Sequence, residues 1–300
     1  MSNYIEGTNL TTMSRRHHYV AVGFQRGFSL GGRIMLYDKQ LRTKRNVGVR
    51  DAFVERGYNS FVDEDGTEVE DLELRWGEIE NTTLPIVRAL DTRREPSELE
   101  QLAIKQLAAV HLARSQAFRN ASAANFRSNM EHVAATNESN DRLFELFVSE
   151  RGREPNAGEL AELTRDSMAR SEERRQLRVE SMIGIYNRTI EMMQPWSVQL
   201  VMPTSTAGFS FSDSPLVNTD GERTGVGEVA LGDSREIFMP MRRDLAIAFS
   251  SRRIDNVQIP SQGIDRVNYA TWGNAARFVA AHPHEHPSSV VPNYSDWIAR

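Results

Sequence analysis

The amino-acid sequence predicts an α+β fold in which β segments from both ends of the chain form one mostly antiparallel sheet, with a large helical block inserted between them. Two observations predict it. Both ends are rich in β-branched and aromatic residues, whereas residues 70–194 repeat apolar side chains at the spacing of helices. This order of strands, helices and strands is typical of α+β proteins rather than of alternating α/β proteins.

We expect a single domain over residues 1–300, because a chain of this length can bury one large core. Within it the sequence predicts an N-terminal β region at 17–60, the helical block at 70–194, and a C-terminal region at 195–300 that combines strands with a terminal helix. No internal repeat divides the chain further.

The N-terminal β region is expected to hold three strands, at Tyr19–Phe24, at Arg33–Tyr37 and around Val47–Phe53, since these runs favour extended backbone. Gly31 and Gly32 are typical of a turn between the first two strands. We expect a curled antiparallel piece.

The helical block begins near Glu70. The stripe of its first helix consists of Leu72, Trp76, Ile79, Thr83, Ile86 and Leu90. Pro85 should kink or interrupt this helix. Ser97 with Glu100 forms a capping box that predicts the start of a second helix. Further apolar groups at 143–147 and 179–193 complete the block.

Alternating apolar residues bring back β character from Pro195 onward. Strands are expected at 196–202, around 209–211, at 237–241 and at 245–249. A final helix is predicted over Asp265–Ala280, and the polar, proline-broken tail after it is expected to be mobile.

Composition narrows the class of protein. The formal charge of −5 gives no global positive field that would draw the chain to nucleic acid, although local basic patches stay open. The absence of cysteine excludes disulfides, thiolate zinc sites and a cysteine nucleophile. Without a membrane span or targeting segment, we expect a soluble cytoplasmic protein that is not bound to a membrane. The oligomeric state stays open.

Two polar clusters lie far apart in the sequence, RRHHYVAVGFQRGF at 15–28 and FSFSDSPLV at 209–217. If the two β segments share a sheet, the clusters meet in one pocket, and we predict that the ring of His18 and the carboxylate of Asp213 converge there. His18 is preferred to His17 because alternate residues of a strand share a face, and the face of His18 would carry Val20 and Val22 inward.

These clusters resemble a bacterial family known as domain of unknown function 4238. The matching segments, in order from His17 to about Phe249, are HHYVAVGFQRGF, Ile79-Glu80-Asn81, HLARSQAFR, FSFSDSPLV and FMPMRRDLAIAF. The chain departs from the family pattern at Ala21, where a proline is expected, and at Gly23, where an aromatic residue is favoured. The resemblance implies an equivalent fold and site but transfers no reaction. A role in conflict or defence is the biological context that we expect.

Three residues are candidates for catalysis. An imidazole at His18 suits a general base near neutral pH. Asp213 and Glu80 suit oxygen ligands of Mg²⁺ or Mn²⁺, which could activate water against a phosphodiester. Each also has a structural interpretation: a histidine bonded to backbone, a turn-closing aspartate and a solvated acidic helix face.

Four further residues are candidates for substrate binding: Arg26, Arg114, Tyr19 and Ser212. A semi-buried arginine either grips a phosphate or pairs with a carboxylate, and the sequence does not separate the two.

The function favoured by these residues is a metal-dependent hydrolase of phosphodiesters, nuclease-like, with nucleic acid or a protein as partner. The alternative is a non-catalytic module that binds a protein or a ligand. Motifs for nucleotide cofactors, zinc proteases and α/β-hydrolases are absent from the sequence.

Overall fold

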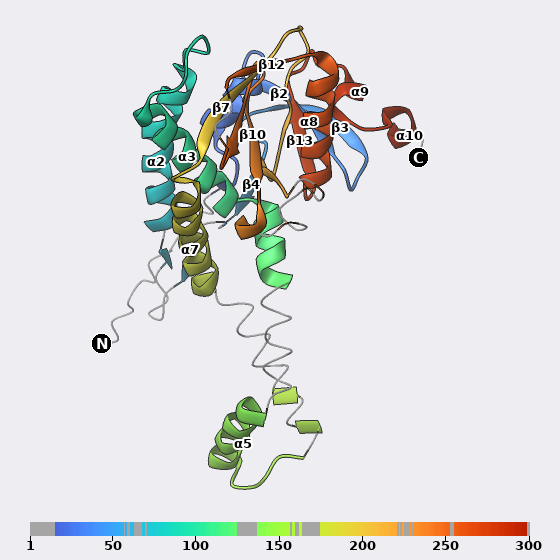
Figure 1. The fold of residues 1–300 in the computed structure, drawn as a ribbon. Helices are drawn as coiled ribbons and strands as arrows, with labels where there is room; N and C mark the ends of the chain where they lie inside the picture. The colour runs from blue at the N-terminus through green and yellow to red at the C-terminus, as the bar shows by residue number, and fades with distance from the viewer. Residues whose placement is uncertain are drawn as a thin grey trace, which may run out of the picture.

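A four-stranded antiparallel sheet joins the two ends of the chain, as the sequence predicts. In a computed structural model, its order is β3-β2-β13-β8. The strands are β2 (Arg33–Asp38), β3 (Thr43–Gly48), β8 (Phe211–Ser212) and β13 (Phe278–Ala281). Strand β13 lies between β2 and β8, so residues from both termini meet in this sheet (Figure 1).

The structure describes residues 16–56, 58, 61–62, 68–69, 71–124, 137–156, 158–159, 162–163, 175–220, 222, 224, 229, 231–252 and 255–298. Arg15, the first residue of the first polar cluster, lies outside the described residues. So do most of residues 221–232, which the sequence predicts to form a loop between strands.

A five-stranded sheet of order β12-β7-β11-β10-β9 is built from the C-terminal region alone. Its strands are β7 (Ser197–Pro203), β9 (Val217–Thr219), β10 (Glu236–Arg242), β11 (Leu245–Ser250) and β12 (Val257–Ile259). All pairs are antiparallel except β12 with β7. Every residue of the central strand β11 is buried, as expected for a strand covered on both faces.

Two small ribbons complete the described strands. One pairs β1 (Arg16–His18) with β4 (Val54–Arg56), and the other pairs β5 (Phe61–Val62) with β6 (Glu68–Val69).

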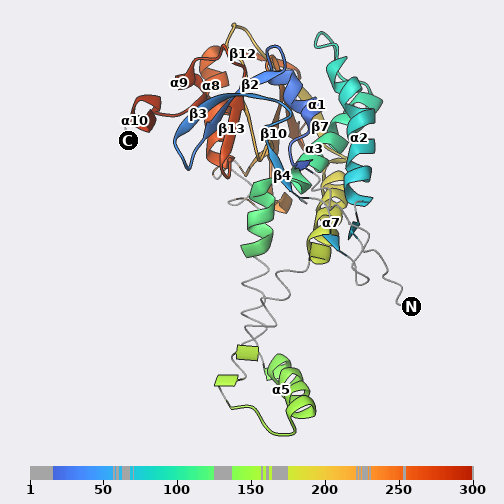
Figure 2. The ribbon, with the colours of Figure 1, turned by 180° about the vertical axis from the view of Figure 1, so that it is seen from behind.

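The helical block packs its long helices beside the sheets. Helix α3 (Glu98–Ala113) contacts both α2 (Asp71–Arg88) and α7 (Arg175–Met193) (Figures 1 and 2). The capping box of α3 is confirmed, since Ser97 Oγ accepts from Glu100 N and Glu100 Oε2 accepts from Ser97 N. Pro85 lies inside α2 without interrupting it.

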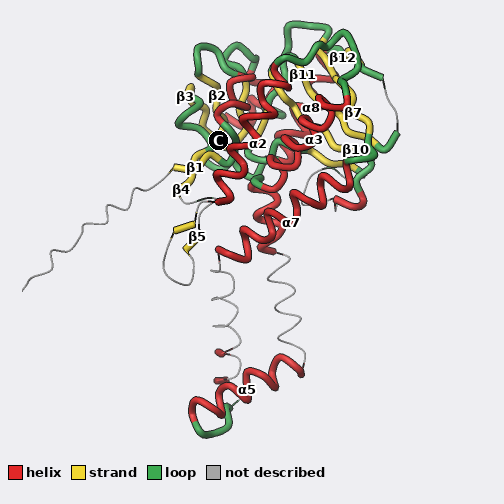
Figure 3. The backbone as a smooth tube through the Cα atoms, turned by 90° about the vertical axis from the view of Figure 1, so that its left-hand side faces the viewer, coloured by secondary structure: helices red, strands yellow, loops and turns green. Residues whose placement is uncertain are grey.

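Helix α5 (Asn137–Arg151) stands well away from the sheets (Figure 3). At the C-terminal end, α8 (Ser261–Asn274) packs against β8, β9 and β12, and α9 (Pro287–Val290) packs against α8 and α10 (Tyr294–Ile298). The tail expected to be mobile therefore carries two short helices.

The predicted strand at Tyr19–Phe24 is wrong. After β1 the chain forms α1 (Val22–Gln25) and the 3-10 turn η1 (Arg26–Phe28). Val20, Phe24 and Phe28 are each four residues apart and all buried, so a helical backbone points them into one core. The rings of Phe24 and Phe28 both contact that of Phe211.

The predicted helix over Asp265–Ala280 is wrong at both ends, because α8 spans Ser261–Asn274 and residues 278–281 form the strand β13. The strand expected around Val47–Phe53 lies earlier, at β3, where it pairs with β2 over its whole length. The carboxylate of Asp213 accepts hydrogen bonds from the N–H groups of residues 276–278, which end the helical backbone after α8.

Candidate functional site

The guanidinium of Arg114 is the centre of a buried ionic cluster. Arg114 directly follows α3 and is 2% exposed, and its Nη1 donates to Glu80 Oε1. Its Nη2 lies 3.7 Å from Glu73 Oε2. Glu73 and Glu80 are two turns apart on one face of α2, with Trp76 between them, so one arginine can face both carboxylates.

Burial strongly perturbs the groups around Arg114. Burial raises the pKa of Glu80, and the charge of Arg114 opposes this rise because it favours the charged carboxylate. Burial lowers the pKa of His111 to about 3, and the nearby Arg114 charge lowers it further, so His111 is neutral at pH 7.

Several buried donors and acceptors in this cluster lack a protein partner. Among the described residues, no group bonds to either ring nitrogen of His111, to Arg114 Nε or to Trp76 Nε1. His111 lies in the last turn of α3, three residues before Arg114, and Trp76 lies between the two carboxylates that Arg114 faces. Unpartnered buried polar atoms are costly and mark places that water or a ligand satisfies.

His18 lies at the edge of this cluster. Its Nε2 is 3.1 Å from the carbonyl oxygen of Arg50, and its ring is half-buried. Burial lowers the pKa of His18, and the charges of Arg114 and Arg16 lower it further. His17 is the more buried of the two histidines, at 4% exposed, whereas His18 is the one whose ring lies near the Arg114 charge, so the choice of His18 as the histidine of the site stays a prediction. The strand ends at His18, so Val20 and Val22 do not continue its face.

Asp213 anchors the backbone between α8 and β13. Its Oδ1 accepts from Ala276 N at 2.9 Å, and its Oδ2 accepts from Arg277 N at 2.7 Å and from Phe278 N at 2.8 Å. These bonds take up the N–H groups directly after α8 and turn the chain into β13. Burial raises the pKa of Asp213 to about 6, although the three N–H donors lower it.

Ser212 closes the turn that leads to Pro215. Its Oγ donates to Ser214 O at 2.8 Å and accepts from Ser214 N at 3.1 Å. The serine therefore closes this turn, which leaves Asp213 free to reach across to residues 276–278. Tyr19 lies near Asp213, and burial together with the Asp213 charge raises the pKa of the Tyr19 hydroxyl.

The segment after α3 connects the Asp213 loop to the Arg114 cluster. Gln116 N donates to Asp213 O at 3.2 Å, and Ala117 N donates to Ser214 Oγ at 2.9 Å. The hydroxyl of Tyr58 donates to Arg114 O at 2.6 Å. The two polar clusters of the sequence thus approach each other, although His18 and Asp213 share no hydrogen bond or ion pair among the described interactions.

Arg26 lies apart from this network. Arg26 is exposed at the start of η1. Its carbonyl oxygen accepts from Ser29 Oγ, and its guanidinium makes no hydrogen bond with the residues that the structure describes.

The sequence did not single out Tyr58 and Glu55. The guanidinium of Arg119 lies 4.9 Å from the centre of the Tyr58 ring and pairs with Glu55 at 3.0 Å. Burial raises the pKa of Tyr58 to about 12, while the Arg119 charge opposes this rise. Arg119 ends the HLARSQAFR segment, which is the one sequence signal that pointed to this place.

The described residues contain no group of three or more histidine, aspartate or glutamate side chains placed to hold a metal ion. Glu80 is paired with Arg114, and Asp213 with three backbone donors. A divalent cation on these two carboxylates would therefore have to replace existing bonds. In the same part of the chain, no helix is long and apolar enough to cross a membrane.

The fold and the polar network define an α+β protein whose terminal β segments share a sheet and whose inserted helices carry a buried ionic cluster. The chain belongs to the family described as protein of unknown function (DUF4238), whose sequence profile matches residues 16–285 of the 300. No curated protein and no solved structure matches the chain.

Proposed function

We propose that the chain is a non-catalytic module that binds a polyanion, with nucleic acid as the partner to test. One observation carries the proposal: residues 39–50 contain Lys39, Arg42, Lys44, Arg45 and Arg50 and no acidic residue, in a chain whose formal charge is −5. A concentrated positive surface on an acidic protein is suited to phosphate backbones.

The position of these cations supports binding. Strand β3 is an edge strand of its sheet, and Arg42, Lys44, Arg45 and Arg50 are exposed. The ammonium of Lys44 lies 5.2 Å from the centre of the Tyr294 ring, which stacks on Trp297, so this cation–π contact holds the Lys44 charge at the surface beside β3. The same charges also keep the edge strand from pairing with another sheet.

The existing bonds of the Asp213 and Glu80 carboxylates support a non-catalytic role. Both proposed metal ligands already hold the fold together, Asp213 through three backbone donors and Glu80 through Arg114.

Replacing Lys44 and Arg45 together by glutamine should weaken nucleic-acid binding and flatten its salt dependence. Each lost phosphate contact reduces the slope of log K against log salt by about 0.7 on single strands and about 0.9 on duplex DNA. The measurement is fluorescence anisotropy with labelled single-stranded DNA, duplex DNA and RNA between 50 and 200 mM salt.

The matched control replaces Arg93 and Arg151 by glutamine, which removes the same charge from exposed positions elsewhere. An equal loss of affinity in both double variants would show that the net charge of the chain, and not the stretch 39–50, determines binding. Absence of salt-dependent binding by the unmodified chain would refute the proposal.

A second candidate, the metal-assisted hydrolase, is favoured by one observation. His18 and Glu73 lie beside Arg114 with partial access to solvent, and the basic stretch 39–50 ends at Arg50, whose carbonyl oxygen contacts His18. In this candidate His18 acts as base, Glu80 and Asp213 hold Mg²⁺ or Mn²⁺, Arg114 or Arg26 holds the phosphate, and Tyr19 and Ser212 contact the substrate.

If the hydrolase candidate is correct, His18→Ala should reduce cleavage of single-stranded DNA or RNA about 100-fold or more, the usual contribution of a general base. The melting temperature should stay nearly unchanged, because His18 makes one hydrogen bond to an exposed segment. The assay follows labelled strands with Mg²⁺ or Mn²⁺, with Arg93→Gln as control. Uncut strands with the unmodified chain, or equal rates in both variants, would eliminate this candidate.

A further inference from the structure

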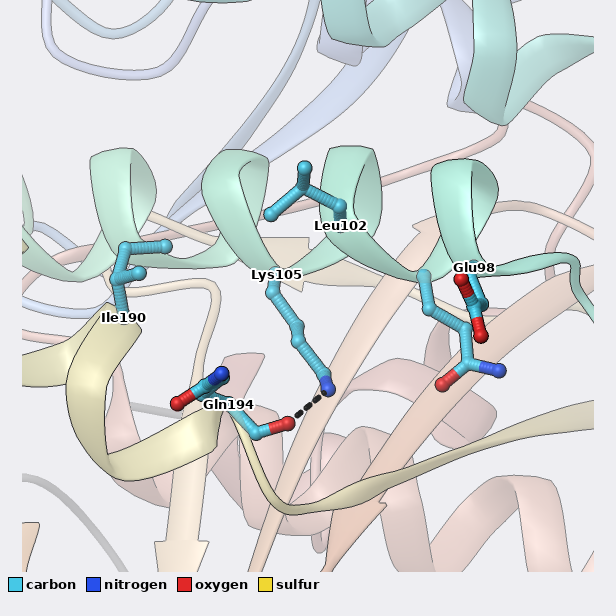
Figure 4. Close-up of a pocket in the computed structure, with 6 residues that line it drawn as sticks. Glu98, Leu102, Lys105, Ile190 and Gln194 are labelled. Carbon is cyan, nitrogen blue, oxygen red and sulfur yellow. Dashed lines mark hydrogen bonds between the residues drawn. The ribbon is translucent and has the colours of Figure 1, made fainter.

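A cavity of about 400 Å³ lies between the start of α3 and the end of α7, on helices that do not include the basic stretch 39–50 (Figure 4). Six residues line it: Glu98, Gln101, Leu102, Lys105, Ile190 and Gln194. The cavity thus combines one cation, one anion, two amides and two aliphatic side chains.

The ammonium of Lys105 is buried without a carboxylate. Lys105 is 8% exposed, and its Nζ donates to Gln194 O at 2.9 Å, at the C-terminal end of α7 (Figure 4). An ammonium carries three N–H donors, and no other described group accepts from this one. Burial also lowers the pKa of Lys105. A buried charge with unused donors favours an anionic partner.

Glu98 supplies the opposite charge. It is exposed in the first turn of α3, and its carboxylate makes no hydrogen bond or ion pair with any residue that the structure describes. Glu98 and Lys105 are seven residues apart, so they lie on one face of the helix, about 10 Å apart along its axis. Figure 4 shows both side chains extending from the same side of α3.

The pair of opposite charges limits the ligand. A cation and an anion that line the same cavity suit a molecule carrying both a carboxylate and an ammonium, because each of these groups can then form a charge-assisted hydrogen bond. Leu102 and Ile190 add apolar surface for an aliphatic body. A dianion such as a phosphate monoester would meet the uncompensated charge of Glu98.

We propose that this cavity binds a small zwitterion of the amino-acid type with an aliphatic side chain, its carboxylate on Lys105 and its ammonium on Glu98. This site is separate from the basic stretch 39–50 and does not depend on nucleic-acid binding.

Calorimetric titration of the full chain with three probes tests the proposal: L-leucine, 4-methylpentanoate, which lacks the ammonium, and 3-methylbutylamine, which lacks the carboxylate. Leucine should bind, and each half-charged probe should bind at least about tenfold more weakly, the loss expected for one charge-assisted bond. Equal affinity for leucine and 4-methylpentanoate, or no heat with leucine at millimolar concentration, would overturn it.

Variants assign the two charges. Glu98→Gln should weaken leucine binding about tenfold or more and leave 4-methylpentanoate unaffected, whereas Lys105→Met should abolish binding of both and Lys105→Arg should restore part of it. Glu191→Gln, an exposed position on α7 outside the cavity lining, is the control. If Lys105→Met unfolds the chain, Glu98→Gln decides alone, and unchanged leucine affinity in that variant would reject the site. Nucleic-acid anisotropy should be the same for Glu98→Gln and the unmodified chain.

Discussion

Asp213→Ala is expected to lower the free energy of unfolding by about 3–5 kcal/mol, because it removes a buried carboxylate that accepts from three backbone N–H groups at once. The orphaned donors belong to residues 276–278, where α8 has ended and the central strand β13 begins. The loss should therefore disturb the sheet that joins the two ends of the chain. Urea unfolding followed by circular dichroism measures it.

The control is Asp244→Ala, since the side chain of Asp244 is 67% exposed and its one ion pair among the described residues is with Arg242. A change within about 1 kcal/mol is expected there. If Asp213→Ala unfolded as readily as the unmodified chain yet lost binding or cleavage of nucleic acid, Asp213 would belong to a working site and the structural role would be wrong.

Secondary structure was predictable from sequence where local signals agreed with the fold. The capping box fixes the start of α3 through two local hydrogen bonds, so it reads correctly without knowledge of the rest of the chain. The pairing of terminal β segments followed from the order of periodicities. The errors at Tyr19–Phe24 and 278–281 fall where distant contacts decide, with Phe211 in the first case and Asp213 in the second.

The site was harder to predict, because a side chain's role depends on its partner. Glu80 and Arg114 were each singled out, but whether the arginine binds a phosphate or a carboxylate depends on the packing of α2 against α3. Lys105 was missed although it is a charge in the apolar run LAIKQLAAV. Such a lysine is either exposed or buried with a special partner, and only the position of α7 decides which.

Arg114→Met should cost about 3–5 kcal/mol of unfolding free energy, since it leaves the carboxylate of Glu80 buried without its counter-charge. Replacing both partners, as Arg114→Met with Glu80→Met, should recover much of the loss, because apolar side chains of similar size remove both buried charges. The coupling energy in this double-mutant cycle measures the pair directly. Additive losses in the double variant would show that the pair contributes nothing to stability.

The pH dependence of the Arg114→Met defect gives an independent check with a fixed sign. Burial raises the pKa of Glu80 and Arg114 opposes the rise, so removing the arginine should raise the pKa further. A raised folded-state pKa stabilises the fold below the ordinary carboxylate pKa, and this contribution is lost as the pH rises through the folded-state pKa. The defect, measured against the unmodified chain by urea unfolding, should therefore be smaller at pH 4 than at pH 8. A defect that is constant over this range, or larger at pH 4, would mean that the charge of Glu80 is not what Arg114 compensates, and the arginine would then stabilise the fold through its packing between α2 and α3.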